Sequence, residues 1–110
     1  MIQAISTATV ELVPQAIVNR PVRQVIGQRA TVIREADDLD WYEGASFMLN
    51  SGLEIAVRHY RGYPPDTTGI YIDRKVNDIQ EITKLIRMIL KEFDLSEDVL
   101  NWERADNPDL

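Results

Sequence analysis

The fold is decided by the stretch Leu53–Phe93, which reads LEIAVRHYRGYPPDTTGIYIDRKVNDIQEITKLIRMILKEF. Its first segment, Leu53–Tyr60, has apolar side chains at odd positions until His59 and mostly polar ones at even positions. This period of two predicts a half-buried strand. Gly69–Asp73 alternates in the same way. We expect the two strands to pair as a hairpin across the loop that contains two consecutive prolines.

The second half of this stretch predicts an amphipathic helix over residues 77–93. Its apolar side chains recur at steps of three and one, which is the helical period; they are Ile79, Ile82, Leu85, Ile86, Ile89, Leu90 and Phe93. Asn77 is the expected N-cap, with Gln80 at the capping-box spacing. A single apolar stripe of this length has to pack on an apolar surface, and the sheet before it provides one.

A further hairpin is predicted just before this stretch, around the turn at residues 50–52. Centring the loop on Ser51 puts the large aliphatic side chains of both strands on one face. The same register places Glu43 opposite His59 on the inner face and Tyr42 opposite Tyr60 on the outer face. A bulge at Gly44 would shift the outer pairing by one residue.

The two ends of the chain have weaker patterns. Within the uncertain segment 1–36 we expect a short helix near residues 21–28 and a strand near residues 30–35, and residues 5–13 fit a helix or a strand. A short helix is predicted from Glu97 to about Arg104, and residues 106–110 are expected to form a loose tail. The predicted fold is a single α+β domain, residues 1–110. It has an antiparallel meander of three to five strands, mainly within residues 40–75, and a long C-terminal amphipathic helix packed on one face.

The charge and composition restrict the classes of function. The formal net charge is −6, and the acidic groups concentrate in residues 35–43 and 94–110. This distribution disfavours nucleic-acid binding, which needs a clustered positive field. No apolar run approaches the length of a membrane span, no basic leader is seen, and cysteine is absent. We therefore expect a cytoplasmic protein with no membrane association.

The reactive side chains concentrate at residues 58–66. One interpretation makes His59 a general base oriented by Glu43, with Asp66 nearby. The anionic group of a substrate, a phosphate or a carboxylate, would then be held by Arg58, Arg61 and Tyr60. The structural alternative is that His59 ends the inward row of the strand, bonded to Glu43 or to a carbonyl group. Arg58 would then make an ordinary cross-strand contact with Asp73 or Tyr71.

The acidic stretch before the first hairpin is a second candidate. It contains Asp37, Asp38, Asp40, Trp41 and Tyr42. It lacks the glycine, the ligand spacing and the terminal Glu of a calcium loop, so we expect no metal there. The two aromatic residues are instead suited to anchor a basic protein partner on an acidic surface. The sequence contains no cofactor fingerprint, and we expect no cofactor.

The leading hypothesis is a non-enzymatic protein-interaction or regulatory module, such as an acidic inhibitor or immunity-like protein. The alternative is a small enzyme or ligand-binding domain that acts on an anionic small molecule. Open sheet edges have to be paired or covered. Because the β-branched N-terminal segment could form an edge strand or exchange with a second copy, we also expect a homodimer.

Overall fold

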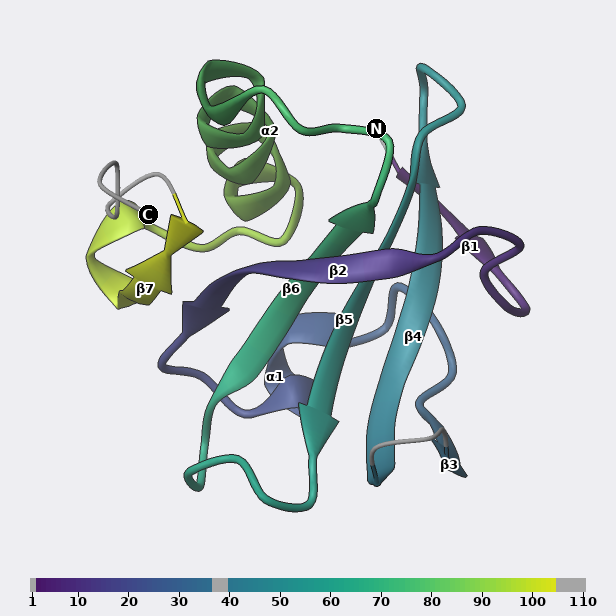
Figure 1. Ribbon diagram of the computed structural model, residues 1–110. Helices are drawn as coiled ribbons and strands as arrows, with labels where there is room; N and C mark the ends of the chain where they lie inside the picture. Colours follow the sequence, from purple (N-terminus) through teal and green to yellow (C-terminus); the bar gives the residue numbers. More distant parts are fainter. Residues whose placement is uncertain (1, 37–39, 105–110) are drawn as a thin grey trace.

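The computed structural model describes residues 2–36 and 40–104, which form an antiparallel β-sheet with two helices (Figure 1). The seven strands are β1 (Ile2–Ile5), β2 (Leu12–Val18), β3 (Ile33–Ala36), β4 (Trp41–Leu49), β5 (Glu54–Tyr60), β6 (Thr68–Asp73) and β7 (Leu100–Glu103). The helices are α1 (Val22–Ile26) and α2 (Ile79–Glu92), and a 3-10 turn, η1 (Glu97–Val99), precedes β7. The strand order is β1-β4-β5-β6-β2-β7, with β3 also paired to β4.

The predicted fold class is wrong. The described residues form seven strands instead of three to five, and only β3, β4, β5 and β6 follow one another as a meander. The helix has 14 residues and is not the C-terminal element, since β7 follows it and pairs with β2. The sequence pattern missed β2 because the pairing of β2 with β6 shifts register between Pro14 and Ala16, which breaks the period of two.

The register predicted for the hairpin around residues 50–52, formed by β4 and β5, is confirmed. Glu43 lies opposite His59 and Tyr42 opposite Tyr60, and the pairing of β4 with β5 runs through Gly44 without a shift. Gly44 is required here because a Cβ atom at this position would lie 2.3 Å from the carbonyl oxygen of Val57. The glycine therefore allows a close approach of two backbones.

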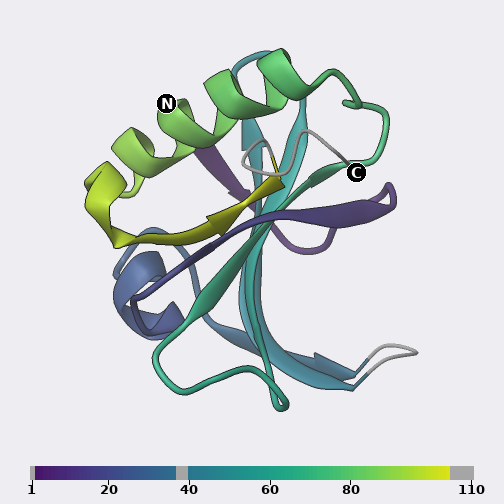
Figure 2. The ribbon, with the colours of Figure 1, turned by 60° about the vertical axis from the view of Figure 1, so that its left-hand side comes forward.

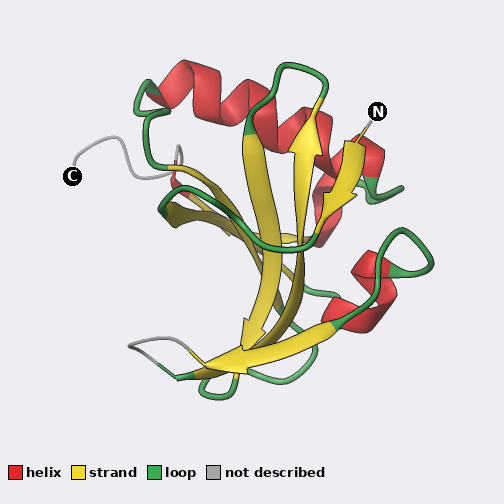
Figure 3. Ribbon diagram, turned by 90° about the vertical axis from the view of Figure 1, so that its right-hand side faces the viewer, coloured by secondary structure: helices red, strands yellow, loops and turns green. Residues whose placement is uncertain are grey.

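The sheet has two different faces. Both helices lie on one of them, here called the helix face (Figures 2 and 3). Their apolar residues form the main core with inward side chains of the strands, including Phe47, Ile55 and Ile72, which are fully buried. The opposite face, here called the outer face, carries a smaller cluster around Tyr60 and Tyr71.

Helix α2 begins one residue later than predicted. Asp78 is the N-cap in place of Asn77, and its carboxylate accepts a hydrogen bond from the backbone N–H of Gln80 at 3.2 Å. Farther along the helix, Arg87 donates two hydrogen bonds to Glu103 of β7, at 2.6 and 2.9 Å. This buried contact fixes α2 to the strand that the sequence did not predict.

The weaker predictions have mixed outcomes. The helix near residues 21–28 is present as α1, and the strand near residues 30–35 is present as β3, shifted toward its C-terminal end. The helix predicted from Glu97 is wrong, because only one 3-10 turn forms before the chain extends as β7. The spacing of the apolar residues Val99, Leu100 and Trp102 is compatible with a helix and with a strand. The predicted loose tail, residues 106–110, lies outside the described residues.

Candidate functional site

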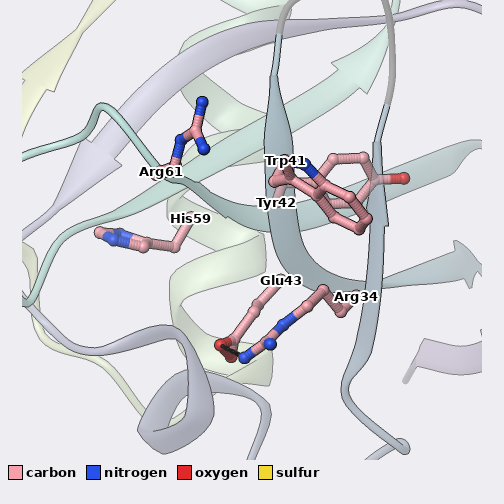
Figure 4. Close-up of a pocket in the computed structure, with 6 residues that line it drawn as sticks. All are labelled: Arg34, Trp41, Tyr42, Glu43, His59 and Arg61. Carbon is pink, nitrogen blue, oxygen red and sulfur yellow. Dashed lines mark hydrogen bonds and ion pairs between the residues drawn. The ribbon is translucent and has the colours of Figure 1, made fainter.

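A depression with a volume of about 380 Å³ opens on the helix face, where β4 and β5 extend beyond α1 (Figure 4). Six residues line it: Arg34, Trp41, Tyr42, Glu43, His59 and Arg61. Most of the lining is carbon surface, with the charged groups around it. Such a concave, largely apolar surface with a few polar groups is the usual form of a binding site.

The strand register explains why these residues meet. On β4, Trp41 and Glu43 are two residues apart and share the helix face, and His59 lies opposite Glu43 on β5. On the other side of β4, Arg34 of β3 is paired with Glu43. Three adjacent strands thus each contribute at least one side chain to the same surface.

The carboxylate of Glu43 is bound by two arginines. One of its oxygens, Oε1, accepts a hydrogen bond from Nη2 of Arg34 at 3.1 Å, and the other, Oε2, lies 3.0 Å from Nη2 of Arg23 in α1. The hydrogen bond from Arg34 has the largest effect and lowers the pKa of Glu43. Burial opposes it, and the charge of Arg23 lowers the pKa further, so the net shift is downward. Glu43 therefore stays ionised, with each of its oxygens bound to an arginine.

The ring of His59 is held by a different group. Its Nδ1 lies 2.7 Å from the carbonyl oxygen of Thr67, and the ring meets that of Tyr63 edge-on with centroids 5.9 Å apart. Because a carbonyl oxygen only accepts hydrogen bonds, Nδ1 carries the proton. In Figure 4 the ring points away from Glu43. The two residues are opposite each other in register but do not form the expected pair.

Trp41 is the exposed aromatic group of the depression. Half of its surface is accessible, at 50%. Beside it, Nη2 of Arg61 lies 3.0 Å from Oδ1 of Asp40, and that same oxygen accepts a hydrogen bond from the backbone N–H of Trp41 at 2.7 Å. Tyr42 differs from Trp41 because it is buried and its hydroxyl donates to Glu35 at 3.1 Å.

The remaining predicted site residues lie elsewhere. Arg58 and Tyr60 belong to the outer face, on the other side of β5 from His59. Asp66 is exposed in the loop between β5 and β6 and does not line the depression. Asp37 and Asp38 fall outside the described residues. The predicted cluster at residues 58–66 is therefore divided between two faces and a loop.

Sequence reasoning missed the partners that hold Glu43 and His59. The position of Arg34 opposite Glu43 depends on the pairing of β3 with β4, which the sequence pattern does not predict. Arg23 reaches Glu43 from helix α1. The partner of His59 is the backbone carbonyl group of Thr67, and a pattern of side chains does not indicate a backbone partner. Along the sequence only four residues separate Ala36 of β3 from Trp41 of β4, and this short spacing is a signal that could have indicated the first contact.

Neither a metal site nor a membrane span emerges from the described residues. Within residues 2–36 and 40–104, no three His, Asp or Glu side chains are grouped so that they could hold a metal ion. None of the helices described there is long and apolar enough to cross a membrane.

Comparison with known proteins gives no relative. No family model, no curated protein and no solved structure matches this chain. The function must therefore be inferred from the residues themselves.

Proposed function

We propose that the protein is a non-enzymatic interaction module that binds a basic segment of a partner protein at the depression around Trp41. The observation that carries this proposal is the half-exposed indole of Trp41 in a mostly apolar depression. Tryptophan in a concave surface is the residue type that contributes most to binding energy at protein interfaces. Its ring face also attracts the cationic group of a lysine or arginine.

The charges around the depression support a basic occupant. Three cations, Arg23, Arg34 and Arg61, are already bound to Glu43 and Asp40. By sequence, residues 35–43 carry five carboxylates and no cation, so the chain segment that contains Trp41 has a surplus of negative charge. This surplus would attract a basic segment and would repel an acidic one.

The state of the acid–base groups supports a binding role over a catalytic one. General acid–base catalysis requires a base within hydrogen-bond reach of its substrate and a group that orients this base. Here Glu43 binds two arginines and His59 binds the carbonyl group of Thr67, so the expected pair in which Glu43 orients His59 is not formed. The two residues thus contribute to the architecture of the depression.

The test is a titration of the protein into a fluorescently labelled arginine-rich peptide, with a glutamate-rich peptide of the same length as comparison. We expect saturable binding of the basic peptide only, weakened by added salt. Trp41→Ala should weaken it about tenfold, since cation–π contact and loss of apolar burial together contribute about 1–2 kcal/mol.

The matched control is Met88→Ala, which removes another exposed apolar side chain, 42% accessible, from the distant helix α2. This variant should bind the basic peptide as the wild type does. In a Trp102→Phe background Trp41 is the only tryptophan, so its emission should change on binding. Equal weakening by Trp41→Ala and Met88→Ala would show that the attraction is a general effect of charge, and would refute the proposed site.

A further inference from the structure

The outer face holds a second concave surface, centred on Arg58. It is a groove of about 490 Å³ whose polar lining includes Arg58 and Tyr60 of β5, Tyr71 of β6 and Tyr63 of the loop between β5 and β6. Leu12 and Pro14 of β2 line its apolar side. Since Arg58 and His59 are adjacent on a strand, they point to opposite faces, and this groove is separate from the depression around Trp41.

Arg58 is a partly buried cation that has no ion-paired carboxylate among the described residues. Its guanidinium group lies between two rings, 4.6 Å from the centroid of Tyr42 and 5.1 Å from that of Tyr71. Its Nη1 donates a hydrogen bond to the hydroxyl oxygen of Tyr60 at 3.3 Å. Within the described part of the chain, no Asp or Glu lies within ion-pair distance of Arg58. A guanidinium group has five N–H donors in one plane, so stacked rings leave its donating edge open to a ligand.

The tyrosine hydroxyls add donors beside this edge. The hydroxyls of Tyr63 and Tyr71 contact each other, and because only one proton can lie between them, the second is free to donate outward. Burial, together with the contact to Tyr63, raises the pKa of Tyr71, so this hydroxyl stays neutral and able to donate. Gly69, opposite Arg58, makes room for these rings, since a Cβ atom there would lie 2.8 Å from Cε1 of Tyr71.

We propose that this groove binds a small monocarboxylate with an apolar body. The planar carboxylate matches the donor edge of Arg58 and a tyrosine hydroxyl, and the body of the ligand lies on Leu12 and Pro14. Asp40 also lines the groove, and its negative charge opposes a dianionic phosphate more strongly than a singly charged carboxylate. This inference does not depend on the proposed function, because it concerns the other face of the sheet.

The experiment is an NMR titration of the ¹⁵N-labelled full chain with 4-phenylbutyrate, its neutral amide and inorganic phosphate. We expect saturable shifts at the Nε–H of Arg58 and at the backbone amides of Tyr63 and Tyr71 with the carboxylate. The amide should bind at least about tenfold more weakly because it loses the charge-assisted hydrogen bonds. Phosphate should also bind at least about tenfold more weakly, because Asp40 opposes its second charge and it has no apolar body to lie on Leu12 and Pro14.

The variants separate this site from general charge effects. Arg58→Met, which keeps the length of the side chain, should weaken carboxylate binding about tenfold or more, and Tyr63→Phe should weaken it by a smaller factor. Lys84→Met, which removes an exposed cation of α2 on the helix face, should change carboxylate binding by less than about twofold. Thermal unfolding of each variant checks that it is folded, and Tyr63→Phe supplies the test if Arg58→Met unfolds. The proposal is overturned if the carboxylate, its amide and phosphate shift the same resonances with equal affinity, or if the carboxylate causes no shift at these residues.

Discussion

Gly44→Ala should destabilise the protein strongly, because the substitution forces apart two strands at the centre of the sheet. The new Cβ atom would lie 2.3 Å from the carbonyl oxygen of Val57 and 3.2 Å from Cα of Arg58. Both neighbours are backbone atoms, so no side-chain rotation relieves the contact. Restoring an ordinary distance requires a shift of about 1 Å between β4 and β5 and weakens their hydrogen bonds nearby.

The expected cost follows from these two effects. Overpacking a well-packed site costs about 1–3 kcal/mol, and each weakened hydrogen bond adds up to about 1 kcal/mol. We therefore expect a loss of about 2–4 kcal/mol in the free energy of unfolding, which is a large part of the total of a small domain. A domain of this length loses about 4–8 °C in melting temperature per kcal/mol, so the variant should melt about 10–30 °C earlier.

The assay is urea unfolding followed by far-ultraviolet circular dichroism, with thermal melts as a second measurement. Gly62→Ala is the matched control, because a Cβ atom at Gly62 would meet no atom within 4 Å. It should change the free energy of unfolding by less than about 0.5 kcal/mol. A loss below about 0.5 kcal/mol for Gly44→Ala would refute the argument that close approach of the backbones requires this glycine.

Other consequences can be measured on the same protein. Arg87→Met should cost about 3–5 kcal/mol in urea unfolding at pH 7, because it leaves the carboxylate of Glu103, 6% accessible, buried without its cation; the double variant with Glu103→Leu should recover most of the loss. Gln15→Met should raise the free energy of unfolding by about 1 kcal/mol, since neither amide atom of the buried Gln15 has a hydrogen-bond partner among the described residues. The pKa of Glu43 is lowered from 4.5 in the folded protein, so Glu43 stabilises the fold above about pH 4.5 and loses this contribution as the pH falls through its folded value; the difference in unfolding free energy from Glu43→Gln should shrink below pH 4.5. Light scattering at tens of micromolar tests the predicted homodimer, which a monomer mass alone would contradict.

The parts of the fold that the sequence predicts are those where a regular pattern and a turn agree. The hairpin of β4 and β5 is predicted to the residue because its apolar alternation and the turn at residues 50–52 require the same register. Helix α2 is predicted because its apolar stripe continues over several helical turns, from Ile79 to Phe93. Strands of four residues, such as β1 and β7, contain too few residues for a period to be seen, so the predicted number of strands is too low.

The second hairpin shows a different limit. If β5 and β6 are paired so that their apolar side chains share one face, Ile55 can lie opposite Ile72, and it does. That condition allows several registers two residues apart, however, and the turn residues do not distinguish among them. In the structure Arg58 lies opposite Gly69, so neither Asp73 nor Tyr71 is its direct partner. The rings of Tyr42 and Tyr71 instead enclose it from the two neighbouring strands.

The pair of Glu43 and His59 shows why register alone does not predict a site. Register determines which backbones are opposite, but each side chain then binds the strongest partner within reach. For Glu43 these partners are the two arginines of β3 and α1, whose guanidinium groups are always charged and form strong hydrogen bonds to a carboxylate. For His59 the partner is the carbonyl group of Thr67, which the loop after β5 brings within 2.7 Å. The arginines and the carbonyl group of Thr67 belong to elements whose positions the sequence pattern does not determine. The function of such a site can therefore be inferred only after the less regular parts of the chain are placed.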